Sequence, residues 1–191
     1  MAEDVITENE NEEEDELLSS EELELLDQTE VREEDAAQFP QELIVESSEE
    51  IPAERRENVT QMIMRMSVPE KIRLAMLGNR EARKMLIHER NKVVATAVLR
   101  SPKLTTSELV RFAQERGTPE DVILTICKRR TWLKNYQVKL ALVTNPKTPL
   151  PKAIQLLAHL HDKDLQSLTR NKNVSATISQ NAWQVLRKRK R

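Results

Sequence analysis

One stretch of this chain recurs 44 positions after its first copy. Residues 91–102 and 135–146 both begin with asparagine, carry an alanine at the seventh position and end with proline. Apolar triplets also recur, at Ile72, Leu74 and Ala75, at Val110, Phe112 and Ala113, and at Ile154, Leu156 and Leu157. We therefore predict three structural units, residues 67–104, 105–147 and 148–187.

Helix-capping residues punctuate the chain after Val59. A hydroxyl followed about one turn later by an acid satisfies free N–H groups at a helix start, as in Ser67-x-x-Glu70, Thr105-x-x-Glu108 and Thr118-Pro119-Glu120-Asp121. Further starts are indicated at Thr148-Pro149 and Asp162, and stops at Gly78, Pro102, Gly117 and Pro146. Two glycines and 3% aromatic residues disfavour sheets. We predict an all-α fold of about nine helices, three in each unit.

Charge divides the chain into two unequal parts. Residues 1–60 hold 23 of the 32 acidic residues and three arginines, a net charge of -20, whereas residues 61–191 hold 27 basic and 9 acidic residues, a net charge of +18. A segment as acidic as the first part buries too little apolar surface to offset the entropy of ordering. We therefore predict a disordered acidic tail at 1–60, a helical repeat domain at 61–187 and a basic tail at 188–191.

Two apolar islands interrupt the acidic segment. The first comprises Leu17, Leu18, Leu23, Leu25 and Leu26, and the second comprises Leu43, Ile44 and Val45. Ser19-x-x-Glu22 has the pattern of a capping box, so the first island either folds as a short helix on a partner or consists of scattered residues in a tail. The sequence leaves both interpretations open.

A period of 40 to 47 residues with two or three helices per unit resembles HEAT and armadillo repeats. In addition, residues 141–149, which contain Asn145-Pro146-Lys147-Thr148-Pro149, are followed by leucines and by Asp162 and Asp164. This segment resembles the leucine-rich repeat variant of bacteria, and Ser101-Pro102-Lys103-Leu104-Thr105 resembles it less closely. The resemblance implies a curved, right-handed helical solenoid used for binding.

Positive charge peaks in two places. No acid lies between Asp121 and Asp162, whereas this span contains seven bases, and a basic run ends the chain. The candidate binding residues are Lys128, Arg129, Arg130, Trp132, Lys134, Tyr136, Lys139 and Lys147, together with Arg187, Lys188 and Arg189. Interleaved cations and aromatics can contact phosphates and stack on bases, although a tryptophan between helices also serves as a packing residue.

Catalytic and metal-binding patterns are weak. His159 and His161 point to different sides of a helix, and Cys127 lies at an apolar spacing from Ile123 that indicates a core residue. We expect no catalytic residue, metal or cofactor. A lone cysteine, a start without signal-peptide character and no apolar run of about 18 residues predict a cytoplasmic protein without a transmembrane segment.

Two functions fit these features. The first is a non-enzymatic helical-repeat binding or scaffold module for a protein partner with an acidic surface, gated by its own acidic tail. The alternative is a nucleic-acid-binding protein that uses the basic face around residues 128–152 and the C-terminal basic run. The ligand, the process and the oligomeric state are left open by the sequence.

Overall fold

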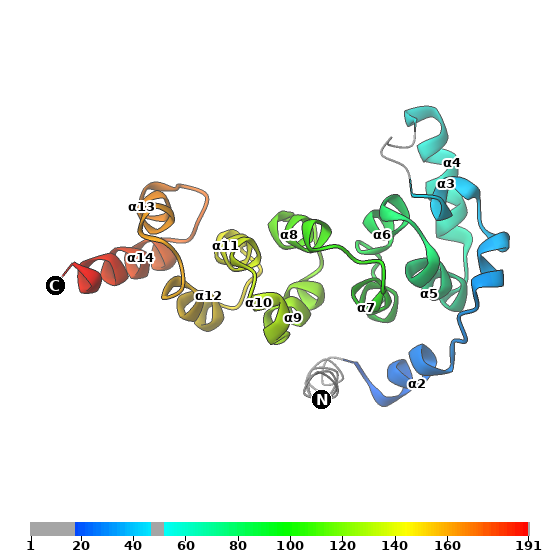
Figure 1. Ribbon diagram of the computed structural model, residues 1–191, viewed down its shortest axis with the longest axis horizontal. Helices are drawn as coiled ribbons and strands as arrows, with labels where there is room; N and C mark the ends of the chain where they lie inside the picture. Colours follow the sequence, from blue (N-terminus) through cyan, green and yellow to red (C-terminus); the bar gives the residue numbers. More distant parts are fainter. Residues whose placement is uncertain (1–17, 47–51, 191) are drawn as a thin grey trace, which may run out of the picture. The chain divides into compact units, whose positions relative to one another are not determined.

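A computed structural model describes residues 18–46 and 52–190, and all regular secondary structure in these ranges is helical (Figure 1). The described residues fall into two compact units. We call residues 18–46 and 52–108 the N-terminal unit and residues 109–190 the C-terminal unit.

The N-terminal unit consists of short helices around a core of aliphatic side chains. Its elements are α2 (Ser20–Gln28), the 3-10 helix η1 (Glu33–Gln38), α3 (Gln41–Ile44), α4 (Ala53–Arg65), α5 (Val68–Leu77), α6 (Arg80–Leu86) and α7 (Lys92–Arg100). Helices α5, α6 and α7 pack on one another, and α2 and α3 pack on them in turn. Helix α8 (Thr106–Gln114) begins here and continues into the C-terminal unit.

The C-terminal unit continues the helical pattern. Its remaining elements are α9 (Glu120–Lys128), α10 (Arg130–Leu133), α11 (Tyr136–Thr144), α12 (Leu150–Leu157), α13 (Asp162–Arg170) and α14 (Ala176–Arg189). Helix α12 packs against α11 and α14, and α13 packs against α14. The helical class is therefore confirmed for the described residues. One-turn α10 gives the stretch 105–147 four helices, one more than we predicted.

The acidic segment differs from the prediction over its described part. Residues 18–46 form α2, η1 and α3, and they bury Leu26, Phe39 and Leu43 in the N-terminal unit. Over this range the structure differs from the predicted disorder, because leucines of both apolar islands, Leu26 and Leu43 among them, pack into a core of the same chain. The capping box of Ser19 and Glu22 is present. Residues 1–17 lie outside the described part.

Several predicted caps are present, and two are not. The boxes of Ser67 with Glu70 and of Thr105 with Glu108 form as predicted. The Thr118 hydroxyl instead donates to the carbonyl of Phe112, 2.8 Å away, and Pro119 takes the N-cap position. Pro149, not Thr148, likewise takes the N-cap position of α12. These prolines start their helices with a preset backbone rather than with a side-chain bond.

The donors of two pairs of hydrogen bonds lie at the predicted 44-residue offset, whereas their acceptors lie 37 and 41 residues apart. Ser101 donates to the carbonyl of Met76, and Asn145, at the equivalent position, donates to the carbonyl of Ala113. Two residues further on, the amine of Lys103 donates to the carbonyl of Leu77 at the end of α5, and that of Lys147 to the carbonyl of Thr118 in the turn between α8 and α9. Each pair ties the turn after one helix to the end of an earlier helix or to the turn that follows it. The repeat and its solenoid arrangement stay predictions, which these matched bonds support.

Candidate protein-binding surface

Most of the predicted site residues lie where α9, α10 and α11 meet. Lys128 ends α9, Arg130 and Lys134 lie in and after α10, and Lys139 lies in α11. The C-terminal unit holds 16 basic residues against five acids. In the part of the chain that the structure describes, Arg130, Lys134 and Lys139 make no ion pair. These three cations therefore remain available to an acidic ligand.

Trp132 is partly covered by a cation of its own chain. The Arg129 guanidinium lies over the indole ring, 4.3 Å from its centroid, and the tryptophan is half-buried. Such a cation–π contact ties the end of α9 to α10. One face of the predicted stacking platform is therefore already used inside the protein.

Tyr136 joins α11 to the start of α13. Its ring stacks on that of His161 with centroids 4.3 Å apart and planes at 27°. Its hydroxyl donates to the carboxylate of Asp164 and accepts from the backbone N–H of His161. Burial and the Asp164 carboxylate raise the pKa of Tyr136. Tyr136 is therefore engaged within the protein, and stacking on a base stays untested. Both partners of this tyrosine were missed from the sequence because they lie 25 and 28 residues away.

The C-terminal basic run is part of a helix. Helix α14 continues to Arg189, whose guanidinium donates to the carbonyls of Ala158 and Leu160 and to the Asp162 carboxylate at 2.6–2.8 Å. These bonds explain why the predicted tail at 188–191 is helical through Arg189. Arg189 is thus a structural residue rather than a free binding residue.

The exposed side of α14 has a mixed character. Trp183 is 54% exposed, and the Arg187 guanidinium lies 5.3 Å from the centroid of its ring. Lys188 is exposed beside them. An exposed tryptophan with adjacent cations is a feature of protein-binding surfaces, where aromatic residues and arginine contribute most of the affinity.

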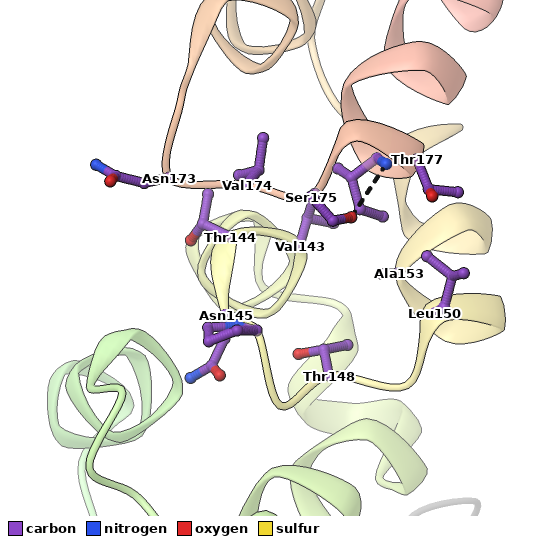
Figure 2. Close-up of a pocket in the computed structure, with 12 residues that line it drawn as sticks. Val143, Thr144, Asn145, Thr148, Leu150, Ala153, Asn173, Val174, Ser175 and Thr177 are labelled. Carbon is purple, nitrogen blue, oxygen red and sulfur yellow. Dashed lines mark hydrogen bonds between the residues drawn. The ribbon is translucent and has the colours of Figure 1, made fainter.

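A pocket of about 290 Å³ opens between the end of α11, helix α12 and the start of α14 (Figure 2). No charged side chain lines it. Its walls combine aliphatic side chains, among them Val143, Val174 and Ile178, with hydroxyl groups. Ser175 uses its hydroxyl to accept the N–H of Ile178, whereas the buried Thr148 hydroxyl has no partner among the described residues. Two cations lie next to lining residues. Lys147 stands between Pro146 and Thr148 in the turn, with its amine on the carbonyl of Thr118, and Arg116 donates to the carbonyl of Asn173.

The acidic segment of the N-terminal unit contacts cations that the sequence interpretation did not single out. Arg73 donates to the carbonyl of Glu30 and lies 3.6 Å from the Asp35 carboxylate, and Arg100 lies 3.5 Å from Asp27. Only the three-dimensional fold brings these residues together, since each pair is separated by 38 to 73 positions. The protein thus already holds an acidic segment of its own.

Groups suited to chemistry are scattered or buried. No cluster of three or more metal-ligating side chains occurs in the two described ranges. Cys127 is buried, and burial raises the pKa of its thiol to about 11, so it is protonated at neutral pH. Among the described helices, none is long and apolar enough to span a membrane.

Comparisons with known proteins give no relative for this chain. It matches no family model, and no match was found among curated proteins or solved structures. The resemblance to HEAT, armadillo and leucine-rich repeat variant proteins therefore stays a prediction.

Proposed function

We propose that this protein is a non-enzymatic helical binding module that docks an acidic segment of a partner protein on its C-terminal unit. The observation that carries the proposal is the surplus of cations in this unit, of which Arg130, Lys134 and Lys139 have no acidic partner in the described residues. Like charges held together on one folded unit repel each other, and an acidic ligand relieves this repulsion.

The aromatic residues favour a protein ligand over a nucleic acid. Proteins that bind single-stranded nucleic acids present open aromatic faces on which bases stack. Here Arg129 covers one face of Trp132, and Tyr136 is held by His161 and Asp164. The cations remain available, but the predicted stacking partners are largely engaged.

The uncharged pocket supplies the apolar part of such an interface. It places aliphatic walls beside Lys147 and Arg116, so a peptide that carries an aliphatic side chain between acids matches both features. Buried apolar anchors usually contribute most of the affinity of a protein interface, whereas exposed charges contribute steering and specificity. We place the anchor of the partner in this pocket.

Two parts of the proposal rest on sequence features. Residues 1–17 contain nine acids and no base, so this segment is a candidate internal competitor that gates the site. The lone cysteine, which is buried and unpaired, suits a reducing compartment, and we infer a cytoplasmic protein.

The test measures binding of labelled probes to the full-length protein by fluorescence anisotropy. The probes are a 16-residue peptide of glutamate and leucine, a matched peptide of glutamate and serine, and single-stranded and double-stranded DNA. We expect the glutamate–leucine peptide to bind most tightly. The variant R130Q/K134Q/K139Q should weaken its binding by about tenfold, because three charge-assisted contacts are lost.

A matched control variant separates this surface from net charge. R65Q/R80Q/R90Q removes three exposed cations of the N-terminal unit and should leave peptide binding within about twofold of wild type. Equal losses in both variants would show that only net charge matters. Tighter binding of either DNA, with a steep dependence on salt concentration, would instead favour the nucleic-acid function.

A further inference from the structure

Helix α7 is buried on all its sides. All of its residues from Val93 to Leu99 are buried, and α5, α6 and α2 pack around it (Figure 1). A helix that is buried all round is stable only with apolar neighbours on all its faces. The face of α7 that α2 covers is therefore a surface that requires apolar cover, which α2 supplies.

Helix α2 buries few side chains against this surface. Leu18 and Leu26 are buried, whereas Leu23 and Leu25 keep part of their surface in water. The ion pair of Asp27 with Arg100 spans 3.5 Å, and the Asp27 side chain is 73% exposed. Exposed pairs of this kind contribute little to stability. Helix α2 is thus held by a few leucines and by weak charge contacts.

Helix α3, in the same acidic segment, is held far more firmly. Leu43 is completely buried, and its carbonyl accepts from the backbone N–H of Asn79 at 2.7 Å. The Asn79 side chain also donates to the carbonyls of Glu42 and Val45, both at 2.7 Å. Helix α3 therefore anchors the segment, while α2 is joined to it through the non-helical residues 29–32 and η1.

We propose that the α5–α7 face is a binding surface for an acidic, leucine-bearing helix of a partner protein, and that α2 occupies it as an exchangeable internal ligand. We call residues 18–28 the arm. A competing helix would share the chemistry of the arm, with leucines three positions apart, such as Leu23 and Leu26, and acids that reach Arg100. The arm leaves while α3 stays attached. This surface lies wholly in the N-terminal unit and does not depend on the cations of the C-terminal unit.

The experiment releases the arm and offers it back as a separate peptide. The probe is a fluorescein-labelled peptide with the sequence of residues 17–30, and the proteins are the full chain and its variant L23D/L26D. A second variant, E24P, breaks α2 without altering its leucines. We expect the probe to bind both variants at least about tenfold more tightly than wild type, where the tethered arm competes at a high local concentration. The same peptide with both leucines changed to aspartate should not bind.

Further substitutions test whether the probe binds to the proposed surface. Adding Arg100→Gln to L23D/L26D should weaken probe binding, whereas adding R130Q/K134Q/K139Q should not. An effect of the C-terminal substitutions alone would assign the probe to the other surface and overturn this proposal while leaving the proposed function intact. Equal binding to wild type and to both variants would overturn it, as would absence of binding to folded variants. Loss of cooperative unfolding in both variants would also overturn it, because the arm would then be an inseparable part of the fold.

Discussion

Arg83 and Glu108 form an ion pair from which water is almost completely excluded, with their side chains 1% and 2% exposed. The guanidinium reaches both carboxylate oxygens, at 2.9 and 3.1 Å, and also donates to the carbonyl of Gly78. Glu108 at the same time completes the capping box with Thr105. A buried charge is tolerated when its hydrogen-bonding capacity is satisfied, and this pair meets that condition.

The substitution Glu108→Gln should destabilise the protein and alter its response to acid. Burial raises the pKa of Glu108, but hydrogen bonds from Arg83 and Thr105 outweigh burial and leave the pKa below its ordinary value of 4.5. The charged form therefore stabilises the fold above about pH 4.5, and this contribution is lost as the pH falls through the lowered pKa. At pH 7 the variant, which leaves Arg83 without its main counter-charge, should lose about 3–5 kcal/mol in urea unfolding.

The pH series supplies the control for this prediction. The stability difference between wild type and Glu108→Gln should shrink as the pH is lowered from 7 to 3, because protonation removes the same charge from the wild type. Glu57→Gln, at an exposed position of α4, should change the free energy of unfolding by less than about 0.5 kcal/mol at each pH. A constant difference across the series would show that the charge of Glu108 is not the source of its effect.

At the scale of the elements, local sequence signals located most helix boundaries. The caps at Ser67 and Thr105 and the stop at Pro146 lie where their patterns predicted, because each acts within one turn of the chain. The folding of residues 18–46 into α2, η1 and α3 could not be predicted from such local signals. Their acidic composition predicts disorder, whereas contacts with residues distant in the sequence, such as Arg73, Asn79 and Arg100, stabilise them.

The candidate site was predictable in composition but not in geometry. The cluster of cations at 128–139 lies together because those residues are neighbours in the sequence. The roles of Tyr136 and Arg189 depend on Asp164, His161 and the end of α12, which come close only after α13 packs. Sequence patterns do not report contacts at such separations.

Gly78 lies in the short connection between α5 and α6. The residue was predicted as a helix stop, and it does follow α5, but its backbone is not in the left-handed region. A Cβ atom there would lie 2.4 Å from the carbonyl oxygen of Leu74 and 2.7 Å from Cβ of Ala82. Glycine is thus needed because α6 turns back closely against the end of α5. Neither contact atom belongs to a flexible side chain that can move aside.

The substitution Gly78→Ala should therefore cost about 1–3 kcal/mol of unfolding free energy through steric crowding. Urea denaturation monitored by circular dichroism measures this cost. Gly117→Ala, at an exposed turn position, is the matched control and should change stability by less than about 1 kcal/mol. A loss at Gly78 no larger than that at Gly117 would contradict the close approach of α5 and α6.

At the scale of the whole molecule, the two units differ in how far their acidic and basic residues balance. In the N-terminal unit, acids of the segment 18–46 contact Arg73, Arg83 and Arg100. In the C-terminal unit there are too few acids to match the cations: Glu115 pairs with Arg111 and Asp162 with Arg189, and a surplus of cations remains. The C-terminal unit therefore carries a net charge of +11, whereas the described residues of the N-terminal unit carry a net charge of only -3. A surface with a surplus of cations, as in the C-terminal unit, gains most from an external acidic ligand.

The predicted repeat provides the remaining whole-molecule test, because equivalent positions should respond alike in both units. Ala97 in α7 and Ala141 in α11 are separated by the 44-residue offset, and both are buried. Replacing either alanine by leucine should destabilise the protein by about 1–3 kcal/mol, since a packed core does not accept the extra volume. Lys103→Gln and Lys147→Gln, the paired controls at the same offset, should cost less because each removes a single hydrogen bond. A large loss at one alanine and none at the other would indicate that the two stretches resemble each other in sequence but do not occupy equivalent places in a repeat.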